Sequence, residues 1–269
     1  MKVMWVCNSK PSALLGTNNV SLSSWIDALY DEISPTADIT VIYPCFDRIN
    51  SNFIRVKGGF GVKQERIFSF FPLKKLVSRY VEILKEVNPE IIHIWGCETP
   101  RSYAFICAAK IVGLEDRVVV YLQGSAQKIG KYYYGGLPLK AKLFLGIKAC
   151  LKLELTFFSG LRYQLYGRYE NKVYKLPVLF IGRTSWDHSL LLSKASKANY
   201  VTLFEEVRKE FYKIKWAGKD CIKGRIFIAQ ASYPLKGFDN VLDALILLNK
   251  WLGGSIELYV AGDFDERNS

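Results

Sequence analysis

Short apolar runs alternate with longer amphipathic stretches along most of this chain. The apolar runs predict strands, and the stretches with apolar residues at helical spacing predict helices. The expected strands are Lys2–Cys7, Asp38–Tyr43, Ile91–Trp95, Arg117–Leu122 and Val178–Ile181. The expected helices are Leu22–Ile33, Leu73–Val87, Pro100–Val112, 138–170 and Ser185–Ser196. This order predicts an α/β fold, a Rossmann-like parallel sheet with helices on both faces.

The middle of this region is less regular. Phe53–Val56 and Arg66–Phe71 predict two short strands around the turn Gly58-Gly59-Phe60-Gly61. These glycines lack the strand-to-helix context of a nucleotide-binding loop, so a hairpin turn is the better interpretation. Asn199–Leu203 predicts a last short strand.

We expect two domains, 1–216 and 217–269, joined at Ala217-Gly218-Lys219-Asp220. The second starts with an apolar run at Phe227, continues with the amphipathic stretch Phe238–Trp251 and then gives the strand Ile256–Ala261. Two strands and one helix cannot bury a core of their own. The sequence therefore predicts an incomplete start of a second Rossmann-like domain.

Composition excludes several kinds of chemistry. The six cysteines form no C-x-x-C pair, and the chain has only two histidines, so we expect no structural zinc site, no disulfide framework and no bound metal. No apolar run reaches the roughly 18–20 residues that a membrane-spanning helix needs. We therefore expect a cytoplasmic protein.

The formal net charge of +12 favours anionic partners. Residues 137–176 carry eight lysines and arginines against Glu154 and Glu170, interleaved with apolar residues. This pattern is typical of a helix on an anionic membrane surface, here the inner face of the plasma membrane, and equally of a solvated lysine face. Motifs for nucleic-acid binding are missing from the sequence, so we expect no nucleic-acid partner.

Polar and small residues follow the predicted strands. In open α/β sheets ligands bind beyond the carboxyl ends of the strands, so these residues mark one candidate rim. They are Asn8, Gly96-Cys97-Glu98-Thr99, Gln123-Gly124-Ser125 and Gly182-Arg183-Thr184. His93 lies inside an apolar strand and is better interpreted as a core histidine. Asp187 is expected to cap a helix or to pair with Arg183, and not to act with His188, since adjacent helical residues point apart.

A second candidate site precedes the helix Phe238–Trp251. Ser232, Lys236 and Gly237 lie in the turn before it, where backbone N–H groups and an ammonium stabilise an anion.

Several blocks together resemble family-four glycosyltransferases, particularly bacterial members that build surface polysaccharides. They are His93-Ile94-Trp95-Gly96-Cys97-Glu98, Gln123-Gly124, 131–138, Ile181-Gly182-Arg183-Thr184-Ser185-Trp186-Asp187 and 230–237. The resemblance implies a GT-B fold that transfers a sugar with retention from a nucleotide-sugar to a saccharide or lipid-linked acceptor, without metal or cofactor. It implies that Lys236 contacts the donor diphosphate and that Glu205 and Glu206 lie near the cleft.

The chain also departs from the family pattern. Ser23-Ser24 stands where many members have paired glycines that receive a phosphate, and Gln123 replaces a histidine. Gln123 and His93 remain the candidates for a catalytic role, although glutamine cannot act as a base. The family's downstream glutamate pair has no counterpart. The alternative is therefore a non-catalytic remnant that acts at most as a membrane-surface binding module.

Overall fold

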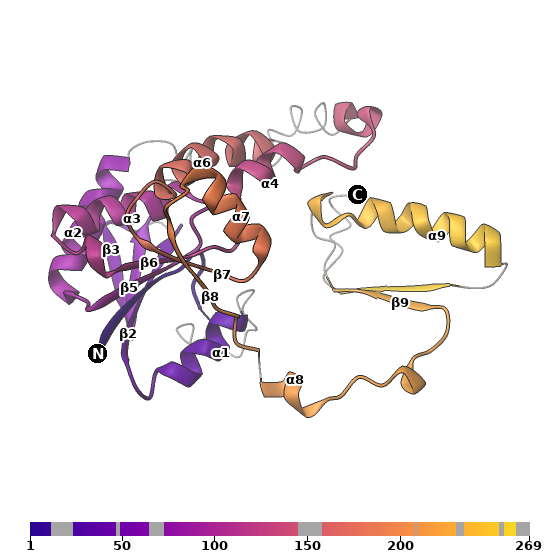
Figure 1. The fold of residues 1–269 in the computed structure, drawn as a ribbon, viewed down its shortest axis with the longest axis horizontal. Coiled ribbons are helices and arrows are strands. Elements are labelled where there is room, and N and C mark those ends of the chain that lie inside the picture. Colours follow the sequence, from indigo (N-terminus) through magenta and orange to yellow (C-terminus); the bar gives the residue numbers. More distant parts are fainter. Residues whose placement is uncertain are drawn as a thin grey trace. The chain divides into compact units, whose positions relative to one another are not determined.

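The computed structural model describes residues 1–11, 24–46, 49–64, 73–144, 158–207, 209–229, 234–252 and 256–261. The chain forms two compact units (Figure 1). The first contains Met1–Gln127 and Leu165–Lys213, and the second contains Lys128–Gln164 and Ile214–Ser269. Helices α4 and α6 carry the chain from one unit to the other and back.

The first unit is built on a sheet of eight strands within the described residues, in the order β3-β4-β2-β1-β5-β6-β7-β8. All neighbours pair in parallel except β3 and β4. The strands are β1 (Lys2–Val6), β2 (Asp38–Cys45), β3 (Phe53–Val56), β4 (Gly59–Lys63), β5 (Ile91–Trp95), β6 (Val118–Tyr121), β7 (Leu179–Gly182) and β8 (Asn199–Thr202).

Helices cover this sheet on both faces, which confirms the predicted α/β class. They are α1 (Ser24–Ile33), α2 (Leu73–Val87), α3 (Pro100–Ile111), α4 (Ala126–Tyr132), α6 (Ser159–Val173) and α7 (Ser185–Lys194). A short helix, α8 (Lys209–Lys213), comes after β8. A 3-10 turn, η2 (Glu115–Arg117), precedes β6. Within the described part of the chain, no helix combines the length and the apolarity that crossing a bilayer requires.

The two faces hold separate apolar clusters because successive strand residues point to opposite sides. On one side Met4 and Val6 of β1 join a cluster with buried residues of α2 and α3, including Ile83 and Phe105. On the other side Trp5 joins Ile26 of α1 and the aromatic rings of β5 and β6. The ring centroids of Trp5 and Trp95 lie 5.4 Å apart, nearly perpendicular to each other.

The glycine-rich segment after β3 differs from the prediction. β3 and β4 do form an antiparallel hairpin, but the turn is at Lys57-Gly58, and Gly59, Phe60 and Gly61 belong to the second strand. The reason is steric, since a Cβ at Gly59 would fall on the carbonyl oxygen of Val41 in β2. Glycine therefore lets β4 approach β2. The predicted strand Arg66–Phe71 lies outside the described residues.

Helix prediction was incomplete between 123 and 173. The structure has a helix at Ala126–Tyr132, between the predicted strand Arg117–Leu122 and the predicted helix 138–170, where no helix was predicted. Of the predicted helix 138–170, residues 139–144 and Ser159–Val173 are helical, residue 158 begins a 3-10 turn, and 145–157 lie outside the described residues.

The second unit includes a β-α-β segment that matches the predicted order. Strands β9 (Arg225–Ile228) and β10 (Glu257–Val260) pair in parallel, and α9 (Phe238–Leu252) connects them after the 3-10 turn η5 (Pro234–Lys236). A further 3-10 turn, η4 (Gly218–Asp220), precedes β9. Large apolar side chains stay exposed here, with Phe227 at 68% and Trp251 at 80%.

The substitution Gly59→Ala tests the close approach of β4 to β2. We expect it to lower the free energy of unfolding by about 2–3 kcal/mol, because the new Cβ forces the two backbones apart. Urea denaturation measures this change. Gly218→Ala is the control, since its Cβ would meet nothing nearer than 3.6 Å. Equal stability of both variants would contradict the steric explanation.

Candidate functional site

The sheet has a topological switch point between β1 and β5. From β1 the chain passes through α1 to β2 on one side, and from β4 it passes through α2 to β5 on the other side of β1. In open α/β sheets this arrangement leaves a crevice beyond the carboxyl ends of the two strands. Asn8 follows β1 and Gly96 follows β5, so both residues stand at this crevice.

Asn8 joins the two sides of the crevice. Its amide Nδ2 donates to the carbonyl oxygen of Trp95 at 3.1 Å. Its Oδ1 accepts from Arg101 at 3.3 Å and lies 3.5 Å from the Thr99 hydroxyl. The amide group is therefore oriented by contacts on both of its ends, which fixes the loop after β5 relative to β1.

Gly96 lets polar side chains approach the backbone after β5 closely. Its φ of +88° is in the left-handed region that favours glycine. A Cβ at this position would meet the carboxylate Oε2 of Glu98, and it would lie 2.9 Å from Asn8 Nδ2 and 3.2 Å from Gln123 Oε1. Three polar side chains thus converge on the place where any other residue would carry a side chain.

Glu98 is buried directly beyond β5. The pKa of its carboxyl group is raised to about 7, mainly by burial and also by the nearby charge of Glu170, although hydrogen bonds from the backbone N–H groups of residues 98, 123 and 124 act to lower it. A substantial fraction of Glu98 is therefore protonated near neutral pH. A protonated carboxyl group can both donate and accept a hydrogen bond.

Glu170 of α6 is buried behind this rim, 1% exposed. Its carboxylate accepts from the N–H of Ala126 at 2.8 Å, from the Ser125 hydroxyl at 3.1 Å and from the N–H of Gln127 at 3.3 Å. These N–H groups belong to the first turn of α4, where a carboxylate is favoured. Burial nevertheless raises the pKa of Glu170.

Arg183 connects the loops after β6, β7 and β8. It follows β7, and its Nη1 forms an ion pair with Glu205 Oε2 at 2.6 Å. Its Nη2 lies 3.4 Å from the carbonyl oxygen of Gln123. Glu206, the next residue, instead accepts from the hydroxyl of Tyr212, with 3.5 Å between the oxygens. Of the predicted pair, Glu205 is therefore the one that joins the rim.

Asp187 caps α7, which is one of the two predicted alternatives. Its Oδ2 accepts from the backbone N–H groups of Arg183 and Thr184, both at 2.9 Å, and the Thr184 hydroxyl accepts from the Asp187 N–H. This reciprocal pair is a capping box. His188 points elsewhere and stacks on the ring of Tyr200, 4.2 Å between centroids.

His93 lies on the sheet face that α1 partly covers. Its ring stacks on Trp95 at 3.9 Å between centroids, and burial lowers the pKa of its imidazole to about 4. Its Nε2 is buried and has no hydrogen-bond partner among the described residues, which differs from the satisfied core histidine that the sequence indicated. A neutral imidazole avoids burying an unpaired charge.

The second candidate site lies before α9. Lys236 is exposed at the end of η5, and Gly237 adopts a φ of +72° directly before the helix. Ser24 begins α1. Ser23 and Ser232 lie outside the described residues.

The structure brings Glu98, Gly96, Gln123, Gly124, Arg183 and Glu205 together around the carboxyl ends of β5, β6 and β7. Sequence reasoning missed Arg101 and Glu170 as parts of this region. Glu170 carried a usable signal, since it is one of two acidic residues in the otherwise basic stretch 137–176. Among the described residues no three acidic, histidine or cysteine side chains gather in a way that could hold a metal ion.

Comparison with known proteins gives only remote likeness. No family model matches the chain, and no curated protein matches it. Sucrose-phosphate synthase from Thermosynechococcus elongatus aligns with 98% of this chain and 71% of its own, at 10% identity and a TM-score of 0.47. UDP-GlcNAc 2-epimerase from Methanocaldococcus jannaschii aligns with 100% of this chain and 67% of its own, at 10% identity and a TM-score of 0.47.

A third solved structure is UDP-N-acetylglucosamine 2-epimerase from Rickettsia bellii, of which the chain covers 62%, at 10% identity and a TM-score of 0.48. At such identities and scores a likeness assigns no activity. The α/β class rests on the sheet itself.

The buried carboxyl group of Glu98 makes stability depend on pH. Its pKa rises from 4.5 to about 7 on folding, so its contribution is present below the lower value and is lost as pH rises through the higher one. Relative to that of wild type, the free energy of unfolding of Glu98→Gln should therefore rise by about 3 kcal/mol between about pH 5 and about pH 8. Urea denaturation across this range measures it.

The control for this experiment is Glu90→Gln, because Glu90 is exposed before β5. It should keep the wild-type pH profile. If the free energies of unfolding of Glu98→Gln and wild type changed in parallel with pH, Glu98 would be ionised throughout this range. That result would contradict the expectation.

Proposed function

We propose that this chain is a sugar transferase of GT-B type that takes a sugar from a nucleotide-sugar donor. The observation that carries the proposal is the rim at the switch point, where amide, carboxyl and guanidinium groups converge around Gly96 and the carboxyl ends of β5, β6 and β7. Such groups hydrogen-bond sugar hydroxyls. The resemblance of the sequence blocks to family-four glycosyltransferases supports the same activity, with retention and without a metal.

The rim of the first unit is the proposed acceptor site. Gln123 and the partly protonated Glu98 are suited to receive and donate hydrogen bonds to hydroxyl groups of a saccharide or lipid-linked acceptor. The ion pair between Arg183 and Glu205 orients the neighbouring loops. We assign no base role to His93, because its imidazole stacks on Trp95 and its Nε2 is buried.

The turn before α9 is the proposed donor-diphosphate site. The N-terminus of a helix carries a partial positive charge, and the exposed Lys236 adds an ammonium next to it. During transfer the bond from the anomeric carbon to the diphosphate oxygen breaks, and a bond to the acceptor oxygen forms. The proton of the acceptor hydroxyl leaves with the diphosphate. Lys236 would stabilise the negative charge that develops on this leaving group.

The proposed setting is bacterial surface-polysaccharide synthesis on the cytoplasmic side of the plasma membrane. The sequence blocks that resemble polysaccharide-building members support this setting.

The donor site is tested by binding of a nucleoside diphosphate and of nucleotide-sugars to the full chain. Lys236→Gln should weaken the binding of uridine or guanosine diphosphate and of their hexose derivatives about tenfold, because one charge-assisted hydrogen bond is lost. Isothermal titration calorimetry measures the dissociation constants. The matched control is Lys250→Gln, at the opposite end of α9. Absence of binding by the wild-type chain to every nucleotide tried would overturn the proposal.

The acceptor site is tested with Gly96→Ala. The added Cβ would collide with the Glu98 carboxylate and crowd Asn8 and Gln123, so these side chains must shift. Sugar transfer should therefore fall about a hundredfold in kcat/KM, while the dissociation constant of the donor stays unchanged. The rate of labelled sugar transfer from the bound donor to saccharide acceptors measures this change.

Gly113→Ala is the matched control for Gly96→Ala. Gly113 has a similar φ of +72°, but a Cβ there would meet nothing within 4 Å. Both variants therefore carry the same kind of backbone strain, and only Gly96→Ala displaces the polar side chains of the rim. Equal loss of transfer in the two variants would contradict an acceptor site at Gly96.

A further inference from the structure

Residues 123–127 lead from β6 into the first turn of α4, and two buried carboxyl groups from other parts of the first unit hold them. The carboxyl group of Glu98, which follows β5, accepts from the backbone N–H groups of residues 123 and 124. The carboxylate of Glu170, in α6, accepts from the Ser125 hydroxyl at 3.1 Å and from the next two backbone N–H groups at 2.8 Å and 3.3 Å. The start of this segment is therefore held by the residues after β5, and its end by α6.

The other groups around the two carboxyls are neutral. Tyr174 follows the end of α6, and its hydroxyl forms hydrogen bonds with Glu170 and with the Cys97 thiol. Burial raises the pKa of both this hydroxyl and this thiol, so neither is charged near neutral pH. Within this cluster of described residues, only the two carboxyl groups can change their charge near neutral pH.

The arginines of the rim pair with other groups. Arg101 Nη2 donates to Asn8 Oδ1 at 3.3 Å, and Arg183 Nη1 forms its ion pair with Glu205. Among the described residues, no lysine or arginine is one of the main influences on the pKa of either buried carboxyl group. Two neighbouring carboxylates without a cation repel each other in a medium of low dielectric constant, so the pair retains one proton near neutral pH.

Glu98 is the member of the pair that carries this proton. Glu170 accepts from two N–H groups and from the hydroxyls of Ser125 and Tyr174, and these four donors stabilise its charged form. An ionised Glu98 would also accept more strongly from its own donors, but its raised pKa shows that burial and the charge of Glu170 outweigh this gain. Glu98 is 9% exposed and Glu170 is 1% exposed, so Glu98 is the one that can turn toward solvent.

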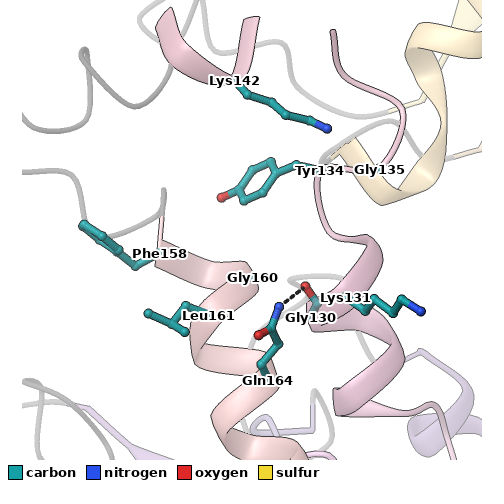
Figure 2. A pocket seen from close by; sticks show the side chains of 9 residues that line it. All are labelled: Gly130, Lys131, Tyr134, Gly135, Lys142, Phe158, Gly160, Leu161 and Gln164. Carbon is teal, nitrogen blue, oxygen red and sulfur yellow. Dashed lines mark hydrogen bonds between the residues drawn. The ribbon is translucent and has the colours of Figure 1, made fainter. Parts of the chain in front are cut away.

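Helix α4 cannot follow such a movement, because α6 holds it along its length. A Cβ at Gly167 of α6 would lie 3.0 Å from the Cβ of Gln127, so the two helices are in close contact at the start of α4. Toward the end of α4, the Gly130 carbonyl oxygen accepts from Gln164 Nε2 at 3.3 Å (Figure 2). Freedom to move is thus confined to the residues before Ser125.

We propose that Glu98 holds Gln123 in place on the rim only while its carboxyl group is protonated. When the proton is lost, the Glu98 side chain turns away from Glu170 toward the water of the crevice and releases the N–H groups of residues 123 and 124. Glu170 keeps the start of α4 in place in both states. The rim is therefore ordered on the acid side of this ionisation and loosened on the alkaline side. The effect on sugar transfer rests on the proposed function, whereas the release of these residues does not.

Amide hydrogen exchange, followed by NMR on the full chain, tests the proposal residue by residue. Dividing the intrinsic exchange rate at each pH by the measured rate gives the protection of each N–H group. Between about pH 6 and about pH 8 the protection of residues 123 and 124 should fall about tenfold, because the ionised fraction of a group with a pKa of about 7 rises about tenfold over this range. The N–H groups of Ala126 and Gln127 are the internal control and should keep their protection.

The variant Glu98→Gln keeps the shape of the side chain and removes its proton equilibrium. Its amide oxygen still accepts hydrogen bonds and its side chain cannot ionise, so the protection of residues 123 and 124 should stay high and independent of pH. The matched control is Glu90→Gln, which changes an exposed carboxyl group before β5 and should keep the wild-type dependence on pH.

The same variants test the consequence for the rim. Over the same pH range the KM of the wild-type chain for a saccharide acceptor should rise, while the KM of Glu98→Gln should stay constant. An inactive chain would contradict the proposed function, and the exchange experiment would still decide whether Glu98 controls the loop.

Three results would overturn the proposal. The first is a loss of protection in Glu98→Gln that matches that of wild type, which would assign the pH dependence to another group. The second is an equal loss at residues 123, 124, 126 and 127, which would reflect general loosening of the segment. The third is constant protection of residues 123 and 124 in wild type, which would show that Glu98 stays in place after it ionises.

Discussion

Glu170 fixes the place where the chain leaves the first unit and the place where it returns. Its carboxylate, carried by the returning helix α6, binds the N–H groups that start the departing helix α4. A buried carboxylate needs such donors, and the first turn of a helix needs such an acceptor, so each group satisfies the other. The Ser125 hydroxyl joins the same carboxylate and ties the loop after β6 to it. The position of Gln123 and Gly124 on the rim depends on this contact.

The rim and the segment 128–164 use charge in opposite ways. Inside the rim, acidic groups are buried together, and burial raises the pKa values of both Glu98 and Glu170. Protonation there avoids the electrostatic penalty of two close carboxylates in a medium of low dielectric constant. In residues 128–144 and 158–164 the charged side chains are all basic. They lie at or near the surface, where water hydrates each charge and salt screens it from the others.

Most of the sheet could be predicted from the sequence, because buried parallel strands such as Ile91–Trp95 are continuous apolar runs between turn residues. The segment around Gly59 could not be predicted. Its glycines indicate a turn locally, and only the approach of Val41 from another strand explains them in β4. Helix α4 was missed for a similar reason, since Gly130 disfavours a helix until α6 packs against it.

The location of the candidate rim was predicted from the order of the strands, but the contacts between its side chains could not be predicted. The pairing of Arg183 with Glu205 joins residues that follow different strands, and no local pattern in the sequence indicates which of two neighbouring glutamates makes it. The roles of Asn8 and Glu170 likewise depend on residues about 90 and 45 positions away. Such partners become visible only once the register of β1, β5 and β6 is known.

Because α4 and α6 are held against each other, the residues between them can change in evolution more freely than the strands of the sheet can. Gln127 and Gly167 are neighbours, as are Gly130 and Gln164, so the chain leaves and re-enters at almost the same point. The entropy of closing such a loop grows only slowly with its length. Insertions, deletions and wholesale replacement beyond Gly130 should therefore be tolerated by the sheet, and one scaffold could acquire new surfaces at this position without redesign of its core.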